Sequence, residues 1–213
     1  MEESKSNSGK KEKIMFTSKR DDNFEVYIMD EDGNNVSNLS QNSSVDYGIN
    51  WSPDGNKILF YSDRSGNEEI WQMDLNGSNQ VNLTNAPSNE RNAVYSPDGK
   101  TIAFTSDRDN KIKDIYLMDR EGKNVRRLTH NKVYCESPEW TKDGNHIIFT
   151  LLLKEDNYDK SSNGELFIIN ISGTNLKRLT YKNGFDSGAD FHLMEIRFLF
   201  TEDLNMGIWT FMS

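Results

Sequence analysis

The chain has 213 residues, a formal net charge of −9 and a mean hydropathy of −0.80, and it has no apolar run of the roughly 18 residues that a membrane-spanning helix needs. The acidic balance argues against a partner bound mainly through phosphates, and the single cysteine, Cys135, excludes an internal disulfide framework or a cysteine-rich zinc site. Such a polar composition is common in disordered chains, but 11% aromatic residues is not, so we expect a folded domain that uses few apolar residues.

Residues 1–12 carry no hydrophobic side chain after Met1, and we interpret them as a flexible polar leader. They do not resemble a signal peptide, which needs an apolar central region. Such a tail fits either the segment that follows the lipidated cysteine of a processed lipoprotein or simply a ragged start, and the sequence does not separate the two. The sequence leaves open whether a leader was removed.

The rest of the chain, residues 13–213, repeats one unit, with copies at about 13–40, 41–84, 85–129, 130–180 and 181–213. The three middle copies are complete, and their opening aromatic residues, Trp51, Tyr95 and Trp140, lie 44 and 45 residues apart. Each aromatic is followed by a turn ending in Asp-Gly, two apolar runs, a second turn and a Leu-Thr pair. A period in this range indicates a repeat architecture.

The first and last copies are incomplete. The first lacks the aromatic-Ser-Pro-Asp-Gly segment. The last keeps the nine-residue interval from Phe191 to Phe200, but His192-Leu-Met-Glu195 replaces the turn, and no Leu-Thr pair follows. We expect this last blade to be the least regular, because a bulky residue is disfavoured at positive φ.

One unit is expected to form four short strands. Pro and Gly in the first turn suit a hairpin, and runs such as Ile58-Leu-Phe60 are apolar on successive residues, as in strands covered on both faces. Helix signals are weak throughout. The predicted fold is therefore all-β: a β-propeller of four-stranded blades in about five repeat copies. The sequence leaves open whether five blades close the ring or belong to a longer chain.

The second copy, with Trp51-Ser-Pro-Asp-Gly55, Ser62-Asp-Arg64, Asn76-Gly77 and Leu83-Thr84, closely resembles the TolB-like β-propeller repeat, a WD40-like repeat, and the third copy does so as well. The resemblance covers roughly residues 13–213. It is specific to the repeat type and much less so to a function, since such repeats occur in TolB, in envelope lipoproteins and in the lids of prolyl-oligopeptidase-like peptidases.

Several recurring residues are predicted to have structural roles. The turn aspartates are expected to bind nearby backbone N–H groups, and the arginines of the Ser-x-Arg triplets to tie neighbouring loops to carboxylates or carbonyls. The predicted structural set is Trp51, Pro53, Asp54, Gly55, Arg64, Tyr95, Pro97, Asp98, Gly99, Arg108, Trp140, Asp143 and Gly144.

The fourth copy carries a polar insertion between its two apolar runs, at residues 154–164. Insertions in repeat proteins fall in loops, often on the binding face, although drift is also tolerated there. We therefore single out one possible partner-binding loop, made of Lys154, Glu155, Asp156, Asn157, Tyr158, Asp159 and Lys160.

Catalytic motifs are absent from the sequence: it has no Gly-x-Ser-x-Gly elbow, no phosphate loop, no Rossmann fingerprint and no His-Glu-x-x-His. The three histidines fall at different places in the repeat. We predict no catalytic, cofactor-binding or metal site. Three or more of His130, His192, Glu136, Glu139 and Asp190 within ligand reach would favour an enzyme instead.

The leading hypothesis is a non-enzymatic propeller scaffold for an unidentified protein or glycan partner. Its placement in the periplasm or at the cell surface is implied by the resemblance alone, with the cytoplasm as the alternative. The other hypotheses are the propeller of a polysaccharide lyase, a peptidase-gating lid, or an incomplete propeller fragment. Which rim binds is not determined by the sequence.

Overall fold

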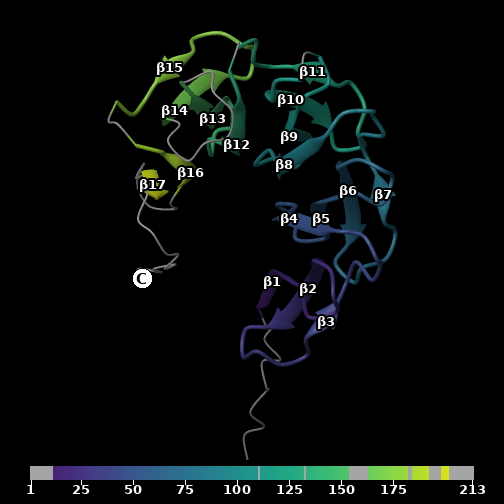
Figure 1. The fold of residues 1–213 in the computed structure, drawn as a ribbon. Helices are drawn as coiled ribbons and strands as arrows, with labels where there is room; N and C mark the ends of the chain where they lie inside the picture. The colour runs from purple at the N-terminus through teal and green to yellow at the C-terminus, as the bar shows by residue number, and fades with distance from the viewer. Residues whose placement is uncertain are drawn as a thin grey trace, which may run out of the picture.

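The computed structural model describes residues 12–109, 111–131, 133–153, 163–181, 184–191 and 198–201, and this part of the chain contains strands, turns and no helix. The strands form five antiparallel sheets (Figure 1). In chain order these are β1 (Lys13–Ser18), β2 (Glu25–Asp30) and β3 (Ser37–Asn38); β4 (Asp46–Trp51), β5 (Lys57–Ser62), β6 (Glu69–Asp74) and β7 (Val81–Asn82); β8 (Glu90–Tyr95), β9 (Thr101–Ser106), β10 (Asp114–Asp119) and β11 (Arg126–Arg127); β12 (Cys135–Trp140), β13 (His146–Leu152), β14 (Gly164–Asn170) and β15 (Lys177–Arg178); and β16 (Ser187–Phe191) and β17 (Phe198–Thr201).

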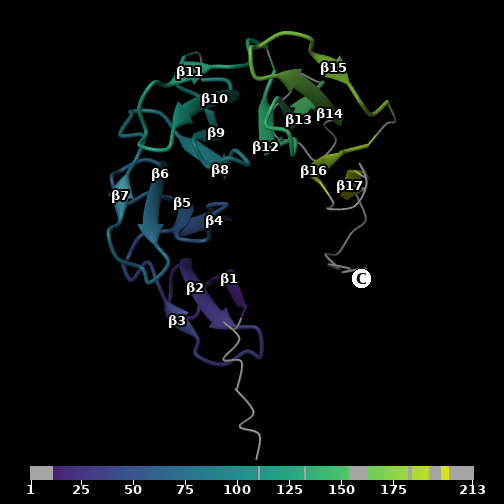
Figure 2. The same cartoon turned by 180° about the vertical axis from the view of Figure 1, so that it is seen from behind.

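The sheets follow one another as blades around an open arc (Figures 1 and 2). Within each sheet the strands pair in chain order, and β4, β8, β12 and β16 lie on the inner side of the arc while β3, β7, β11 and β15 lie on its outer side. The predicted all-β propeller of four-stranded blades is confirmed for the three middle blades. Among the described residues the first blade has three strands, and the aromatic-Ser-Pro-Asp-Gly segment that follows the innermost strand in the complete copies is absent from its sequence.

The core lies between blades. In β5, Ile58, Leu59 and Phe60 are all fully buried, because one blade covers one face of the strand and the next covers the other. Each of the three larger buried clusters draws side chains from two neighbouring blades; one of them joins Ile28 of the first blade to Met73 of the second. This sharing lets a chain of low hydrophobicity bury two faces of every sheet.

The inner strands share a feature that the repeat pattern does not reveal. Each has a bulge at the same place, where one residue has positive φ: Gly48 at +67°, Asn92 at +52°, Ser137 at +53° and Gly188 at +67°. A bulge bends a strand and increases its twist. Two of these four residues are not glycines, so the residue type does not identify the bulge position in the sequence.

Candidate functional site

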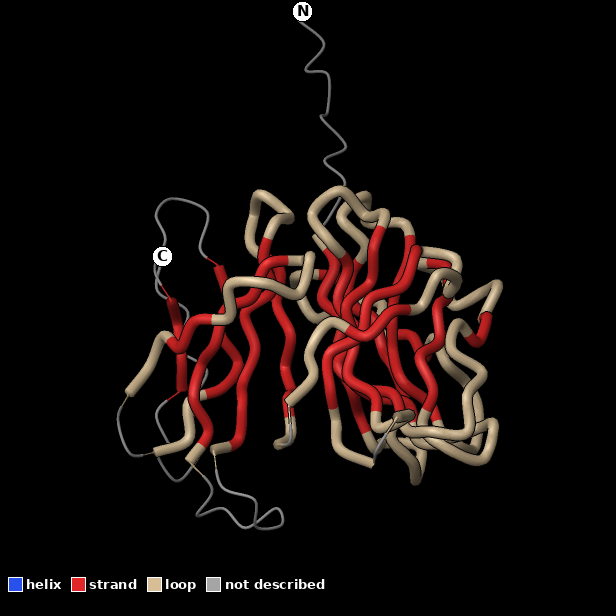
Figure 3. Tube along the Cα trace, turned by 90° about the horizontal axis from the view of Figure 1, so that it is seen from above, coloured by secondary structure: helices blue, strands red, loops and turns tan. Residues whose placement is uncertain are grey.

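The loops of the blades lie on two rims, which Figure 3 shows from the side, above and below the strands. One rim, here called the turn rim, carries the loops between the first and second and between the third and fourth strands of each blade. Backbone bonds join these two loops: the Leu75 N–H donates to the Asn56 carbonyl at 3.2 Å, and the Arg120 N–H to the Lys100 carbonyl at 3.0 Å. The opposite rim carries the loops between the second and third strands and those between blades.

On the turn rim, the aspartates of the first turns bind inside their own turns. Asp143 accepts bonds from the Thr141 hydroxyl at 2.6 Å and from the Asn145 N–H at 3.0 Å, and these donors lower the pKa of its carboxyl to about 2. Asp54 and Asp98 make the same contacts, and the pKa of each is lowered, first by the serine hydroxyl two residues earlier.

The remaining turn-rim residues of the predicted structural set lie between blades. Gly55, Gly99 and Gly144 have φ near +68°, and a Cβ on Gly99 would lie 3.6 Å from the Cδ of Pro53 in the preceding blade. The indole N–H of Trp140 donates to the Val94 carbonyl of the preceding blade at 3.3 Å. These turns therefore pack side by side along the rim.

Two hollows separate successive turns on this rim. The larger, of about 510 Å³, lies between the third and fourth blades and brings Arg126 and Lys142 together with Asp98 and Asp143 beside Trp140. The smaller, of about 240 Å³, lies between the second and third blades and contains Arg120 beside Asp54 and Asp98. Mixed charge beside an aromatic ring can recognise polar or charged ligands.

On the opposite rim, the arginines of the Ser-x-Arg triplets contact buried carboxylates and aromatic rings. Arg64 donates to both oxygens of Asp46 at 3.0 Å and to the Ser62 hydroxyl at 2.9 Å, and its guanidinium lies 4.6 Å from the ring centroid of Trp71. Arg108 repeats the serine contact at Ser106 and donates to Glu90 at 3.3 Å. These charged groups are engaged within the fold.

A second recurring carboxylate was missed by the sequence reasoning. In each of the first four blades, the strand next to the short outer strand has a buried acid as its first or second residue, and a hydroxyl from the Leu-Thr or Leu-Ser pair donates to this acid. Thr129, for example, donates to Asp114 at 2.6 Å and accepts from the Ile115 N–H at 2.9 Å. The acids are Glu25, Glu69, Asp114 and Glu165, with Ser40, Thr84, Thr129 and Thr180 as donors. An acid directly before each second apolar run was the available signal.

The residues proposed as a test for an enzyme do not assemble into a cluster among the described positions. Within the described ranges, no three His, Cys, Asp or Glu side chains are placed to hold a metal ion. Glu139 and Asp190 do face each other on neighbouring inner strands, and burial and then the Asp190 charge raise the pKa of Glu139 to about 7. His192 lies outside the described residues.

The possible partner-binding loop, Lys154 to Lys160, also lies outside the described residues, as does Glu195, on which the expected irregularity of the last hairpin rested. Across the part of the chain that the structure covers, no helix is long and apolar enough to cross a membrane.

Comparison with known proteins agrees with this architecture. The family model of the TolB β-propeller domain matches residues 4–84, and that of the tricorn protease N-terminal β-propeller domain matches residues 65–159. None of the curated protein sequences matches the chain.

Among solved structures, a putative TolB from Agrobacterium tumefaciens superposes with a TM-score of 0.70 at 22% identity over 78% of this chain and 60% of that protein. TolB from Acinetobacter baumannii superposes with a TM-score of 0.66 at 28% identity over 82% of this chain and 42% of that one. Tricorn protease gives 0.53 at 16% identity over 74% and 17%. The chain thus spans less than two thirds of each of these proteins. The repeats, the blade topology and these matches agree that the chain has a β-propeller fold of the TolB type, and residues 4–84 match the TolB propeller model.

Proposed function

We propose that the chain is a non-catalytic scaffold whose blades present loop rims to a protein or glycan partner. The observation that carries this proposal is the use of its buried charges: Asp46, Glu90, Asp114 and Glu165 each lie against an arginine of the same blade. Charges held in this way stabilise the blades, and binding is left to the rims. The net charge of −9 disfavours nucleic acid as the partner.

We place this scaffold in the bacterial envelope, in the periplasm or at the cell surface. The support is the likeness to the two TolB proteins, one of them at 28% identity. The placement is tested by separating cell fractions and detecting the chain by antibody. Recovery in the cytoplasmic fraction alone would contradict it.

The binding proposal is tested by crosslinking the chain to envelope extract and identifying what it captures. Three forms are compared: the intact chain, a variant without residues 154–164, and the double variant Arg126→Glu with Lys142→Glu on the turn rim. We expect the intact chain to capture a partner in an amount that rises with the concentration of the chain, and we expect at least one of the two variants to lose that partner. An intact chain that captures nothing specific would contradict the scaffold function. Unchanged capture by the variant without residues 154–164 would contradict only the proposal that this loop binds the partner.

A second candidate is a peptidase-gating lid, favoured by the match of residues 65–159 to the tricorn protease propeller domain. The lid is tested by adding the chain to a peptidase and following how the cleavage of a peptide library changes. The catalytic candidate is a polysaccharide lyase, which is tested by incubating the chain alone with acidic polysaccharides. Cleavage that is abolished by Glu139→Gln would favour catalysis over the scaffold.

A further inference from the structure

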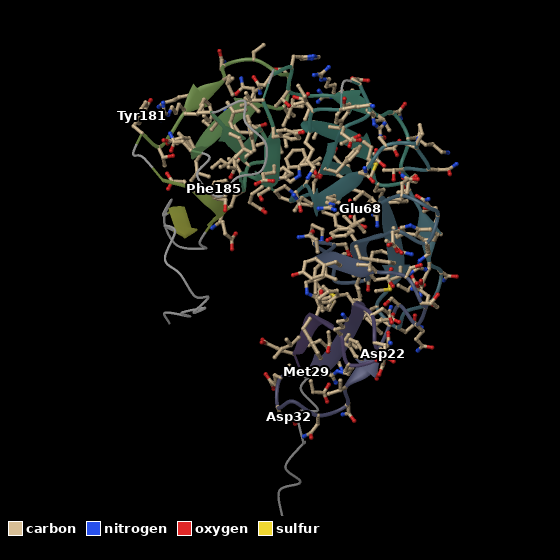
Figure 4. All side chains as sticks on the ribbon, viewed as in Figure 1. Asp22, Met29, Asp32, Glu68, Tyr181 and Phe185 are labelled. Carbon is tan, nitrogen blue, oxygen red and sulfur yellow. The ribbon has the colours of Figure 1, made fainter. Side chains whose placement is uncertain are left out.

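The junction between the second and third blades brings two glutamates together. The N–H of Glu90, the first residue of β8, donates to the carbonyl of Glu68 at 2.8 Å, which places the Glu90 side chain beside that of Glu69. Glu68, labelled in Figure 4, lies on the inner side of the arc where these blades meet. The residues Glu69 and Glu90 are 1% and 0% exposed.

The two carboxyl groups have too few donors if both are charged. Glu69 accepts from the Thr84 hydroxyl, the Ala86 N–H and, at 3.3 Å, the Asn67 amide. Oε1 of Glu90 accepts from the hydroxyls of Ser88 and Ser106 and, at 3.3 Å, from Arg108. No described residue donates to Oε2 of Glu90. Two carboxylates cannot hydrogen-bond to each other unless one of them carries a proton.

Among the ion pairs of the described residues, Arg108 is the positive group that contacts this pair of acids. Arg108 faces Glu90 directly, while the neighbouring Glu68 and Arg91 pair with each other and Asp107 accepts from the Asn89 N–H. Burial and then the neighbouring Glu69 raise the pKa of Glu90 to about 7, although the hydroxyls of Ser88 and Ser106 lower it.

Other junctions have the same backbone bond and a different solution. The Cys135 N–H donates to the Lys113 carbonyl at 2.8 Å, and burial raises the pKa of this thiol to about 12, so Asp114 there faces a neutral partner. At the first junction Asp46 receives two bonds from Arg64 and one from the Asn42 amide.

We propose that Glu69 and Glu90 share one exchangeable proton, and that its loss on alkalinisation weakens the junction between the second and third blades. An acid that is harder to ionise in the folded state contributes stability below its ordinary range, and that contribution is lost as pH rises through the folded value. The junction is therefore tight in mildly acidic medium and looser above about pH 7.

The test measures the thermal midpoint from about pH 5 to about pH 9 for the parent chain and for Glu90→Gln, whose amide can donate to Glu69 without a proton. We expect the parent midpoint to fall between about pH 5 and pH 7, by roughly 2–4 °C per kcal/mol lost, and to level off above pH 7, and we expect the variant to lack this fall. Asp46→Asn is the control, expected to lower the midpoint and to keep the parent's fall below pH 7. An identical pH profile for the parent and Glu90→Gln overturns the proposal, as does a parent with no fall between about pH 5 and pH 7.

A second inference rests on an independent observation, the sequence after Phe191. His192-Leu-Met-Glu195 stands where the other copies have their turn. The codons of residues 192–213 can be read in the frame that starts one base earlier. Each new codon then consists of the last base of one codon and the first two bases of the next. Three residues of this shifted reading are the same for every choice of synonymous codons. Met194-Glu195 gives Gly, Met206-Gly207 gives Gly, and Trp209-Thr210 gives Asp.

All three forced residues fall at positions where the repeat uses them, if one nucleotide is restored after the Phe191 codon. The first Gly then follows Phe191 by four residues, as Gly99 follows Tyr95. The Asp follows that Gly by 15 residues, which is the interval from Gly99 to Asp114, the buried acid at the start of β10. The second Gly precedes the Asp by three residues, as Gly66 precedes Glu69 and as Lys111, whose φ is +59°, precedes Asp114. The same reading also permits Ser-Pro-Asp before the first Gly.

We infer that residues 192–213 are translated one nucleotide out of phase with the sequence that encoded the turn and the start of the third strand of the fifth repeat copy. Resequencing the gene tests this: Ser-Pro-Asp-Gly requires that His192 be encoded by CAC and Leu193 by CTG, and that the shifted frame contain no stop before the Asp. Any other codon at either position overturns the inference.

The protein-level test inserts one nucleotide after the Phe191 codon, with a three-nucleotide insertion at the same place as the control. We expect the one-nucleotide form alone to raise the thermal midpoint and to slow amide exchange in β16, because a Gly in the turn and a buried Asp restore the contacts of the other blades. Equal amide exchange in β16 for the one-nucleotide and three-nucleotide forms would contradict the inference of a shifted reading frame.

Discussion

Gly122 determines how closely the third blade approaches the second. Its φ is +79°, and a Cβ built on it would lie 2.3 Å from the Leu83 carbonyl oxygen of the preceding blade. Gly77 makes the same approach to Leu39, at 2.6 Å. Gly33 has the same φ as Gly122, but nothing lies within 4 Å of the site of its Cβ. The repeat glycine therefore has two separable roles, one in the turn and one between blades.

We predict that Gly122→Ala destabilises the chain much more than Gly33→Ala. Both variants carry a cost of about 1–2 kcal/mol for positive φ, and Gly122→Ala adds about 1–3 kcal/mol because the new methyl group meets backbone that cannot rotate away. Urea unfolding of the two variants measures the difference. Equal losses would show that the approach to Leu83 imposes no constraint.

At the scale of the strand, the Leu-Thr pair joins the outer part of each blade to its third strand. The Leu128 N–H donates to the Ile115 carbonyl at 2.8 Å, and the Thr129 hydroxyl bonds both the Ile115 N–H and Asp114. The outermost strand, β11, has only two residues. A strand this short depends on side-chain bonds beside the ladder.

We predict that Thr129→Val lowers the free energy of unfolding by about 1–3 kcal/mol, because it leaves a buried N–H and a buried carboxylate each short of one partner. The matched control is Thr174→Val, which removes an exposed hydroxyl in a turn of the fourth blade and is expected to change stability by less than about 0.5 kcal/mol. Denaturant titration compares them. A loss for Thr129→Val as small as for the control would contradict this role.

At the scale of the whole molecule, stability is shared between neighbouring blades. One buried cluster joins the third and fourth blades, another the second and third, and a third the first and second. Each blade therefore depends on its neighbours, as in other repeat proteins. The first blade has a described neighbour on one side, and its strand β1 is partly exposed along its length, whereas the equivalent strand β9 is almost wholly buried.

We predict that amide protons in β1 exchange at least roughly tenfold faster than those in β9, because the first blade opens locally at lower cost than the third. Hydrogen exchange followed by mass spectrometry measures the two segments in one experiment. Equal protection would show that the blades unfold as one cooperative unit and would contradict the nearest-neighbour description.

Much of the fold could be predicted from the sequence because the repeat is encoded locally. Pro53, Asp54 and Gly55 specify a turn through their own backbone preferences, and the apolar run that follows specifies a strand covered on both faces. The missing inner strand of the first blade was visible in the same way. These features depend on residues a few positions apart, and their order alone predicts a propeller.

The tertiary structure decided what depends on contacts between neighbouring blades. Only the packed blades place Glu90 beside Glu69 and bring Gly122 against Leu83, and the positive φ of Asn92 and Ser137 became visible only in the folded strands. The sequence indicated that Arg64 would bind a carboxylate or a carbonyl, and the fold identified the Asp46 carboxylate as that group. Local propensity selects the turns and strands, whereas burial between blades determines which charges are neutralised and which must hold a proton.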